Sequence, residues 1–152
     1  MTPRSFLVAA LGLTQLLSLA GCDHAPEIDR VLLSQSVLRN DQSAVLAVTV
    51  TDESGLNDIV GVQLYSEDLS YWYGALTEVS DGVFETTINW GRLHQYSPIT
   101  FDYPIERVVT LVVEDNEGNS DSRNVTFELR CRSAEHACDG ACYPVQFDCK
   151  DL

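Results

Sequence analysis

Short stretches of alternating apolar and polar residues, separated by turn-forming residues, follow one another along most of the chain. The clearest is AVLAVTVT at 44–51, where Leu46, Val48 and Val50 share one face because successive side chains on a strand point to opposite sides. The pattern predicts seven strands, at 28–37 with a bend at 34–36, 44–51, 59–65, 71–79, 83–90, 107–114 and 123–130.

The turns between these strands indicate how the strands are connected. Asp81-Gly82 is a strong hairpin signal between the fourth and fifth predicted strands. The turns at 52–55 and 115–119 each contain a glycine that is free to adopt positive φ. Beyond residue 21 no window has helical periodicity, so no helices are expected as parallel crossovers. The prediction is an all-β fold, a single antiparallel β-sandwich over residues 28–130.

Three segments of this region resemble bacterial immunoglobulin-like or fibronectin-like domains. They are VTVTDESGLNDIVGVQL, GVFETTINW and VTLVVEDNEGNSDSRNVTFEL. The resemblance implies an immunoglobulin-like sandwich and says almost nothing about function. Neither candidate central strand contains a cysteine, so the inter-sheet disulfide of true immunoglobulin domains is not expected.

The first 21 residues have the pattern of an export signal. Arg4 precedes an apolar run over 6–19, which is shorter than the roughly 20 apolar residues that a membrane-spanning helix needs. The run ends in Leu-Ala-Gly-Cys at 19–22, which resembles the lipobox of bacterial lipoproteins. The resemblance implies cleavage after residue 21, lipidation of Cys22, a tether over 22–27 and a lipid anchor in the cell envelope. Which membrane and which side stay open.

The segment 131–152 is a cysteine-rich tail. Its cysteines are Cys131, Cys138, Cys142 and Cys149. An exported chain reaches an oxidising compartment, and so short a segment buries little core, so two disulfides are expected with all three pairings open. Zinc bound with help from His136 is the alternative, but the spacing lacks C-x2-C pairs. The CDGAC run resembles cysteine-rich repeats in lipoproteins of some Gram-negative bacteria.

The composition disfavours two kinds of partner. Without residues 1–21, which contain only Arg4 as a charge, the chain has 8 basic and 23 acidic side chains, so its formal charge is 8 − 23 = −15. Such a chain is repelled by nucleic acid and by anionic lipid head groups. The expected membrane attachment is therefore the lipid itself, since two or three acyl chains anchor a protein stably.

Two acidic turns are candidates for a calcium site. Their carboxylates are Asp52, Asp58, Asp115, Glu117 and Asp121. Carboxylate oxygens suit calcium, and strands that run in the same direction end on the same side of a sandwich. The alternative is structural: acidic side chains accept hydrogen bonds within their own turns while Gly55 and Gly118 adopt positive φ. No cofactor other than this possible calcium is expected.

Three consecutive aromatic residues, Tyr71, Trp72 and Tyr73, are a candidate ligand face. On a strand the two tyrosines point to one side and Trp72 to the other, so at least one ring is available to stack on a sugar or contact a protein. In the alternative, Trp72 fills the core and the tyrosines pair with Phe84 or Trp90.

No catalytic constellation is evident. The histidines, His24, His94 and His136, lie in the tether, a loop and the tail, and no serine lies in a G-x-S-x-G elbow. The protein is therefore expected to be non-catalytic. The first hypothesis is an envelope module that binds or scaffolds a protein partner, which its acidity suggests is basic. A glycan-binding module and a calcium-stabilised adhesion module are the alternatives.

Overall fold

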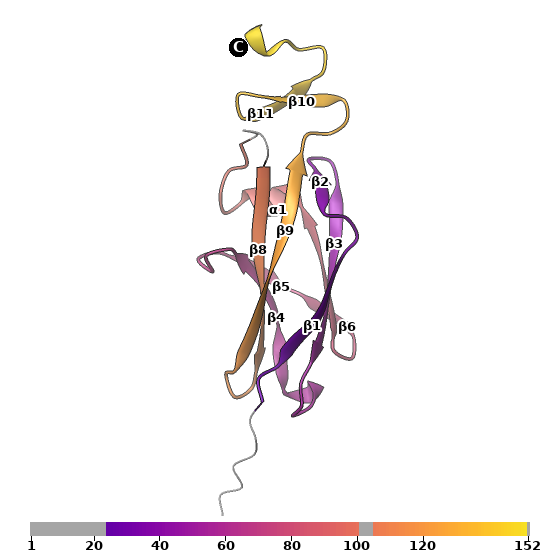
Figure 1. Cartoon of the computed structure of the whole chain (residues 1–152), viewed down its shortest axis with the longest axis vertical. Coiled ribbons are helices and arrows are strands. Elements are labelled where there is room, and N and C mark those ends of the chain that lie inside the picture. The colour runs from indigo at the N-terminus through magenta and orange to yellow at the C-terminus, as the bar shows by residue number, and fades with distance from the viewer. Residues whose placement is uncertain (1–23, 101–104, 152) are drawn as a thin grey trace, which may run out of the picture.

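A computed structural model describes residues 24–100 and 105–151, and in it two sheets pack face to face (Figure 1). One sheet has four strands in the order β1-β3-β7-β6. These strands are β1 (Glu27–Leu33), β3 (Ser43–Thr51), β7 (Val83–Asn89) and β6 (Thr77–Ser80). All its neighbouring strands are antiparallel.

The second sheet has five strands in the order β2-β9-β8-β4-β5. They are β2 (Val37–Arg39), β9 (Ser120–Arg130), β8 (Ile105–Asp115), β4 (Ile59–Ser66) and β5 (Trp72–Ala75). Three of the four pairings are antiparallel, and the short β2 runs parallel to β9 at the edge. The predicted all-β, mainly antiparallel sandwich is confirmed.

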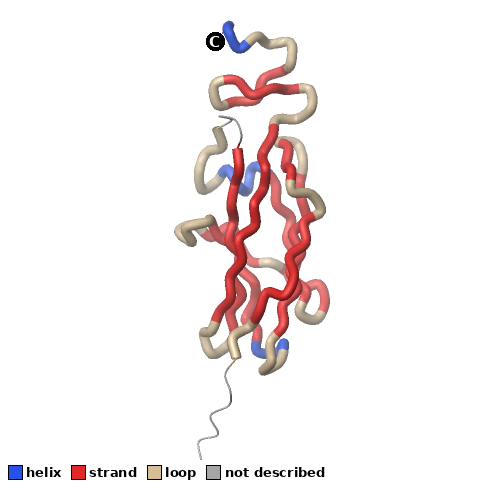
Figure 2. Tube along the Cα trace, viewed as in Figure 1, coloured by secondary structure: helices blue, strands red, loops and turns tan. Residues whose placement is uncertain are grey.

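Helices in the described part of the chain are short, as Figure 2 shows. They are η1 (Leu56–Asp58), α1 (Trp90–His94) and η2 (Cys149–Asp151). The sequence pattern missed α1, since it extends the preceding strand to Trp90. The signal was Asn89, whose side chain accepts a hydrogen bond of 3.0 Å from the backbone N–H of Arg92 and so caps the helix.

Two predicted strands are each divided between the sheets. The stretch 28–37 bends at 34–36 as expected, but its two parts are β1 in one sheet and β2 in the other. The stretch 71–79 likewise forms β5 and then β6. A strand can pass from one sheet to the other at a bend, and a local sequence pattern does not show which sheet each part joins.

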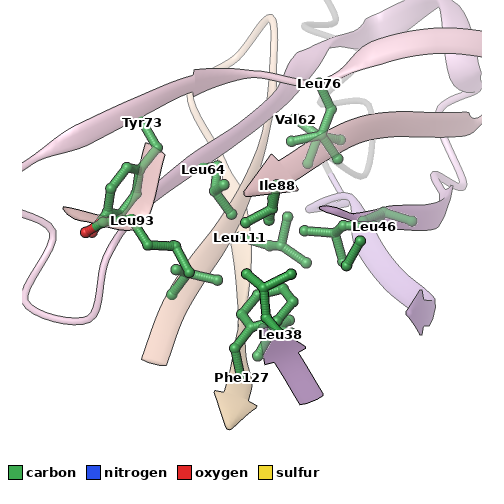
Figure 3. Packing of buried hydrophobic residues seen from close by; sticks show 14 of the residues in the cluster. Leu38, Leu46, Val62, Leu64, Tyr73, Leu76, Ile88, Leu93, Leu111 and Phe127 are labelled. Carbon is green, nitrogen blue, oxygen red and sulfur yellow. The ribbon is translucent and has the colours of Figure 1, made fainter. Parts of the chain in front are cut away.

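The core lies between the two sheets. In β3, Ala44, Leu46, Val48 and Val50 are buried, so Leu46, Val48 and Val50 do share one face and that face points into the core. Figure 3 shows Leu38, Leu64, Leu111 and Phe127 converging from the opposite sheet. The largest side chain that is fully buried is that of Phe127.

The tail forms a separate small hairpin beyond one end of the sandwich (Figure 1). Its strands are β10 (Glu135–Cys138) and β11 (Ala141–Pro144). Two disulfides form as predicted, and the structure selects the pairing: Cys131 with Cys142 and Cys138 with Cys149, at Cα–Cα distances of 5.6 and 5.5 Å. The sulfurs that the zinc alternative required are therefore bonded to one another.

The predicted signal peptide, 1–21, and the lipidated Cys22 lie outside the described residues. The described chain enters the sandwich at the end opposite the tail hairpin (Figure 1). Among the described residues, no helix has the length and apolar character needed to cross a bilayer.

Candidate functional site

A row of side chains crosses the outer face of the five-stranded sheet. Trp72 on β5 is paired with Tyr65 on β4, Tyr65 with Thr110 on β8, and Thr110 with Asn124 on β9. Directly paired residues of antiparallel strands point to the same side, so these four side chains share one surface. We call this surface the Trp72 face.

Trp72 is the most prominent member of the Trp72 face. Its side chain is 57% exposed, and its indole N–H donates a hydrogen bond of 2.8 Å to Oε1 of Gln63. The alternative in which Trp72 fills the core is thus wrong. The reason is register: its paired neighbour Tyr65 points outward, whereas Leu64, one residue earlier on β4, is fully buried.

Tyr73, next to Trp72, points into the sandwich instead. It is only 8% exposed, and Figure 3 shows its ring beside Leu93. Burial raises the pKa of the Tyr73 hydroxyl above its usual value. Of the three predicted ligand-face residues, the structure therefore places Trp72 on the outer face, Tyr73 in the core, and Tyr71 half-buried with its ring against those of Tyr73 and Tyr96.

Arg92 of α1 holds this edge of the sheet in place. Its Nε and Nη2 donate hydrogen bonds of 3.1 and 2.9 Å to the carbonyl oxygen of Tyr73, and Nη1 donates one of 2.7 Å to Thr86. Gly74 makes this approach possible, because a Cβ there would lie 2.9 Å from Nη2. The contact links β5 to β7 in the opposite sheet and so fixes the position of the Trp72 face.

A pocket of about 300 Å³ opens where β4 ends and β8 continues, paired only with β9. Its walls include Asp68 from the β4–β5 turn, Tyr96 from the loop after α1, and Arg107 and Val108 from β8. Tyr96 stacks on Tyr71 at 5.3 Å between ring centroids. Tyr96, Asp68 and Arg107 were not predicted from the sequence, since nothing in a local pattern indicates that three distant segments meet.

Asp68 is held firmly in the wall of this pocket. It accepts hydrogen bonds from the hydroxyls of Ser66 at 2.6 Å, Ser70 at 2.8 Å and Tyr96 at 2.8 Å. These bonds, that of Ser66 most of all, lower the pKa of Asp68 well below its usual value. Asp68 is therefore a carboxylate at neutral pH.

Three of the five predicted calcium ligands come together at the opposite end of the sandwich from the tail. Asp52, Asp58 and Asp115 each contribute a carboxylate oxygen to a group in which these atoms lie within 4.8 Å of one another. The two turns are joined by a hydrogen bond of 2.9 Å from the backbone N–H of Asn116 to the carbonyl oxygen of Asp58. The expectation that both turns fall at one end is thereby confirmed.

Asp115 is the buried member of the group, with 1% of its surface exposed. Burial favours the neutral acid, but hydrogen bonds from Asn119, Glu117 and Gly118 outweigh it and lower the pKa of Asp115. Asp52 accepts a hydrogen bond of 2.6 Å from the Ser54 N–H at Oδ1, while its Oδ2 is buried without a hydrogen-bond partner in the described structure. These oxygens are of the type that calcium prefers.

The other two predicted ligands lie apart from this group. Glu117 is exposed in the turn between β8 and β9, where its backbone N–H donates to Oδ1 of Asp115 at 3.0 Å. Asp121 instead accepts a hydrogen bond of 2.8 Å from the backbone N–H of Ile28, which ties β1 to β9. Gly55 and Gly118 have φ of 110° and 88°, as the structural alternative requires.

Comparisons with known proteins bear on the fold. No family model matches the chain, and neither does any curated protein. A solved structure described as the structural basis for the promiscuous specificity of carbohydrate-binding modules from the β-sandwich superfamily matches with a TM-score of 0.50 and 20% identity over 73% of this chain. The chain spans 36% of that structure's length. This similarity supports a protein of the β-sandwich class.

A second solved structure, the PKD1 domain of Epp from Vibrio anguillarum, matches with a TM-score of 0.44 and 14% identity, over 72% of this chain and 98% of that one.

Proposed function

We propose that this chain is a non-catalytic glycan-binding module and that the Trp72 face is its binding surface. The observation that carries the proposal is the exposure of Trp72, 57% of whose surface is in contact with solvent at a defined position on a sheet. A flat aromatic ring held on the surface is well suited to stack on the apolar face of a sugar ring.

The surroundings of Trp72 suit a sugar better than an apolar protein partner. The hydrogen bond to Gln63 holds the ring, so little side-chain entropy is lost on binding. Asn124 is exposed on the same face, and the hydroxyl of Thr110 donates a hydrogen bond of 3.0 Å to its Oδ1, which leaves the Asn124 amide group to bind sugar hydroxyls. A structural neighbour is described as a carbohydrate-binding module, which supports the proposal at the level of fold.

The test is binding of the protein to a panel of neutral oligosaccharides and cell-wall fragments, followed by titration calorimetry with the best ligand. Trp72→Ala should weaken binding at least tenfold, and Trp72→Phe should restore part of the affinity because a ring remains. Val79→Ala is the matched control, since Val79 is 55% exposed but lies on β6 in the other sheet.

Failure of the wild-type protein to bind any glycan would overturn the proposal, as would equal affinity of the wild-type and Trp72→Ala proteins. Crosslinking to a single basic envelope protein that Trp72→Ala abolishes would instead favour the scaffolding hypothesis.

A second candidate property, calcium-dependent stabilisation, is favoured by the group formed by Asp52, Asp58 and Asp115. Three carboxylate oxygens within 4.8 Å of one another repel unless a cation or a proton lies between them. The buried, unpartnered Oδ2 of Asp52 adds an oxygen that lacks a hydrogen bond. We propose that these residues hold calcium and so fasten the turns that precede β4 and follow β8.

Thermal unfolding with and without calcium tests this property. Calcium should raise the melting temperature of the wild-type protein but not that of Asp58→Asn, which keeps the size of the side chain and removes its charge. Asp81→Asn, in the exposed turn between β6 and β7, is the control and should respond as the wild type does. An equal rise with magnesium in all three proteins would point to general screening of the negative charge and would refute a specific site.

We further propose that lipidated Cys22 anchors the module in a bacterial cell envelope. The support is the lipobox at 19–22 and the preceding apolar run. Metabolic labelling with a palmitate analogue should modify the wild-type protein, and Cys22→Ser should lose both the label and the association with membranes. Unlabelled protein that still sediments with membranes would refute a lipid anchor.

A further inference from the structure

The pocket bounded by Asp68, Tyr96, Arg107 and Val108 adjoins the Trp72 face. Val108 and Thr110 lie on the same side of β8 because they are two residues apart, about 7 Å along the strand. Val108 lines the pocket, so a ligand that extends along β8 from Thr110 of the Trp72 face reaches the pocket within roughly the length of one more sugar ring.

The donors and acceptors in the pocket match a ring that carries several hydroxyl groups. Asp68 and Glu106 offer carboxylate acceptors, and the hydroxyl of Tyr96, which donates a hydrogen bond of 2.8 Å to Asp68, also lines the pocket. Arg107 contributes a guanidinium group to the pocket: its Nη2 donates a hydrogen bond of 3.1 Å to the carbonyl oxygen of Ser97, and its Nε is buried without a hydrogen-bond partner in the described structure. Neighbouring hydroxyls of one sugar can both donate to a carboxylate and accept from a guanidinium.

The negative charge of the pocket further restricts which ligands can bind there. Glu67, Asp68 and Glu106 surround the pocket, against Arg107 as the one cation among its lining residues. Asp68 stays ionised because three hydroxyls donate to it. A ligand that carries its own carboxylate is repelled here, whereas an uncharged ring is not.

We propose that this pocket takes one uncharged pyranose unit of the glycan that lies on the Trp72 face, and that its carboxylates exclude uronic acids. The inference rests on the proposed function, since it assigns a second subsite of the same surface. Stacking on Trp72 supplies affinity for many sugars, and the pocket selects among them.

The experiment compares the neutral glucan, chitin or mannan hexasaccharide that binds best with its form oxidised at C6 to the uronate. The wild-type protein should bind the neutral form about tenfold more tightly. The double variant Asp68→Asn/Glu106→Gln, which keeps both shapes, should lose most of that difference. Val108→Tyr, which fills the pocket from a strand position, should weaken binding of the neutral form at least fivefold. Circular dichroism and the melting temperature show whether each variant is folded.

The outcomes separate the two proposals. If Trp72→Ala abolishes binding while Val108→Tyr leaves it unchanged, the pocket is not a subsite and only this inference fails. The same conclusion follows if the oxidised form binds as tightly as the neutral one. If the wild-type protein binds neither form nor any other glycan, both the proposed function and the proposed subsite are refuted. A change of charge preference in Asp68→Asn/Glu106→Gln together with weaker binding by Val108→Tyr supports the inference.

Discussion

Opening the Cys131–Cys142 disulfide should destabilise the sandwich far more than opening Cys138–Cys149. The two perturbations are the double substitutions Cys131→Ser/Cys142→Ser and Cys138→Ser/Cys149→Ser. Both bonds join residues 11 positions apart, so loop closure alone predicts the same effect for each. The entropy lost by closing such a loop is about 9 cal/mol/K, which corresponds to about 3 kcal/mol at room temperature.

The surroundings of the two disulfides differ. Cys131 directly follows β9, is 8% exposed and belongs to the core cluster, against which Cys142 also packs. Arg39 of β2 donates a hydrogen bond of 2.6 Å to the carbonyl oxygen of Cys131. Cys138, although buried, lies outside that cluster. Loss of the first bond should therefore lower the free energy of unfolding of the sandwich by about 3 kcal/mol, and loss of the second should mainly loosen the tail.

Urea unfolding followed by tryptophan fluorescence measures this difference through Trp72, which lies on β5 of the sandwich, in a Trp90→Phe background because Trp90 of α1 shares a pocket with Cys142 of the tail. Hydrogen exchange in residues 135–144 reports on the tail separately. Equal losses in the two double variants would show that the tail and the sandwich unfold as one unit and would refute the reasoning. A larger loss of unfolding free energy in Cys138→Ser/Cys149→Ser than in Cys131→Ser/Cys142→Ser would refute the reasoning even more strongly.

Three further predictions concern the sandwich itself. Phe127→Ala should cost about 3 to 5 kcal/mol in urea unfolding, because the side chain is fully buried; a loss under about 1 kcal/mol would contradict the packing. Gly82→Ala should destabilise more than Gly118→Ala, since both have positive φ but only at Gly82 would a Cβ lie 2.8 Å from the carbonyl oxygen of Val50; equal melting temperatures would argue against that contact. Because the pKa of Asp115 is lowered by folding, its contribution to stability should be complete above its usual pKa of 3.8 and be lost as the pH falls from there through the lowered value; acid unfolding of Asp115→Asn should lack this component, and identical pH profiles would refute it.

The sequence predicted local features of the fold well where one residue type determines the backbone. Alternation in β3 grouped Leu46, Val48 and Val50 on one face, and Asp81-Gly82 predicted a hairpin in which Gly82 has φ of 68°. Sheet membership was not predictable, since the bend at 34–36 leads to the opposite sheet while looking like an interrupted strand. Asn89 capping α1 was a local signal, but it competed with a strand pattern that continues to Trp90.

For the candidate sites, too, the residue types were predictable and the spatial arrangement was not. The acidic turns and the aromatic triplet were evident from residue types, and so was their chemistry. The sequence did not indicate that Trp72 is exposed and Tyr73 buried, because alternation says that neighbours face opposite sides and not which side is inside. The pocket between Asp68, Tyr96 and Arg107 brings together positions from three separate segments.

By itself the sequence determined an acidic β-sandwich with two disulfides in its tail, because alternation, turn residues and cysteine content act over a few neighbouring positions. Tertiary structure alone decided the cysteine pairing, the orientation of the aromatic residues and the convergence of Asp52, Asp58 and Asp115. The physical reason is that these features depend on strand register and on which strands are neighbours. Both are selected by burial of the whole core between two sheets rather than by any single segment.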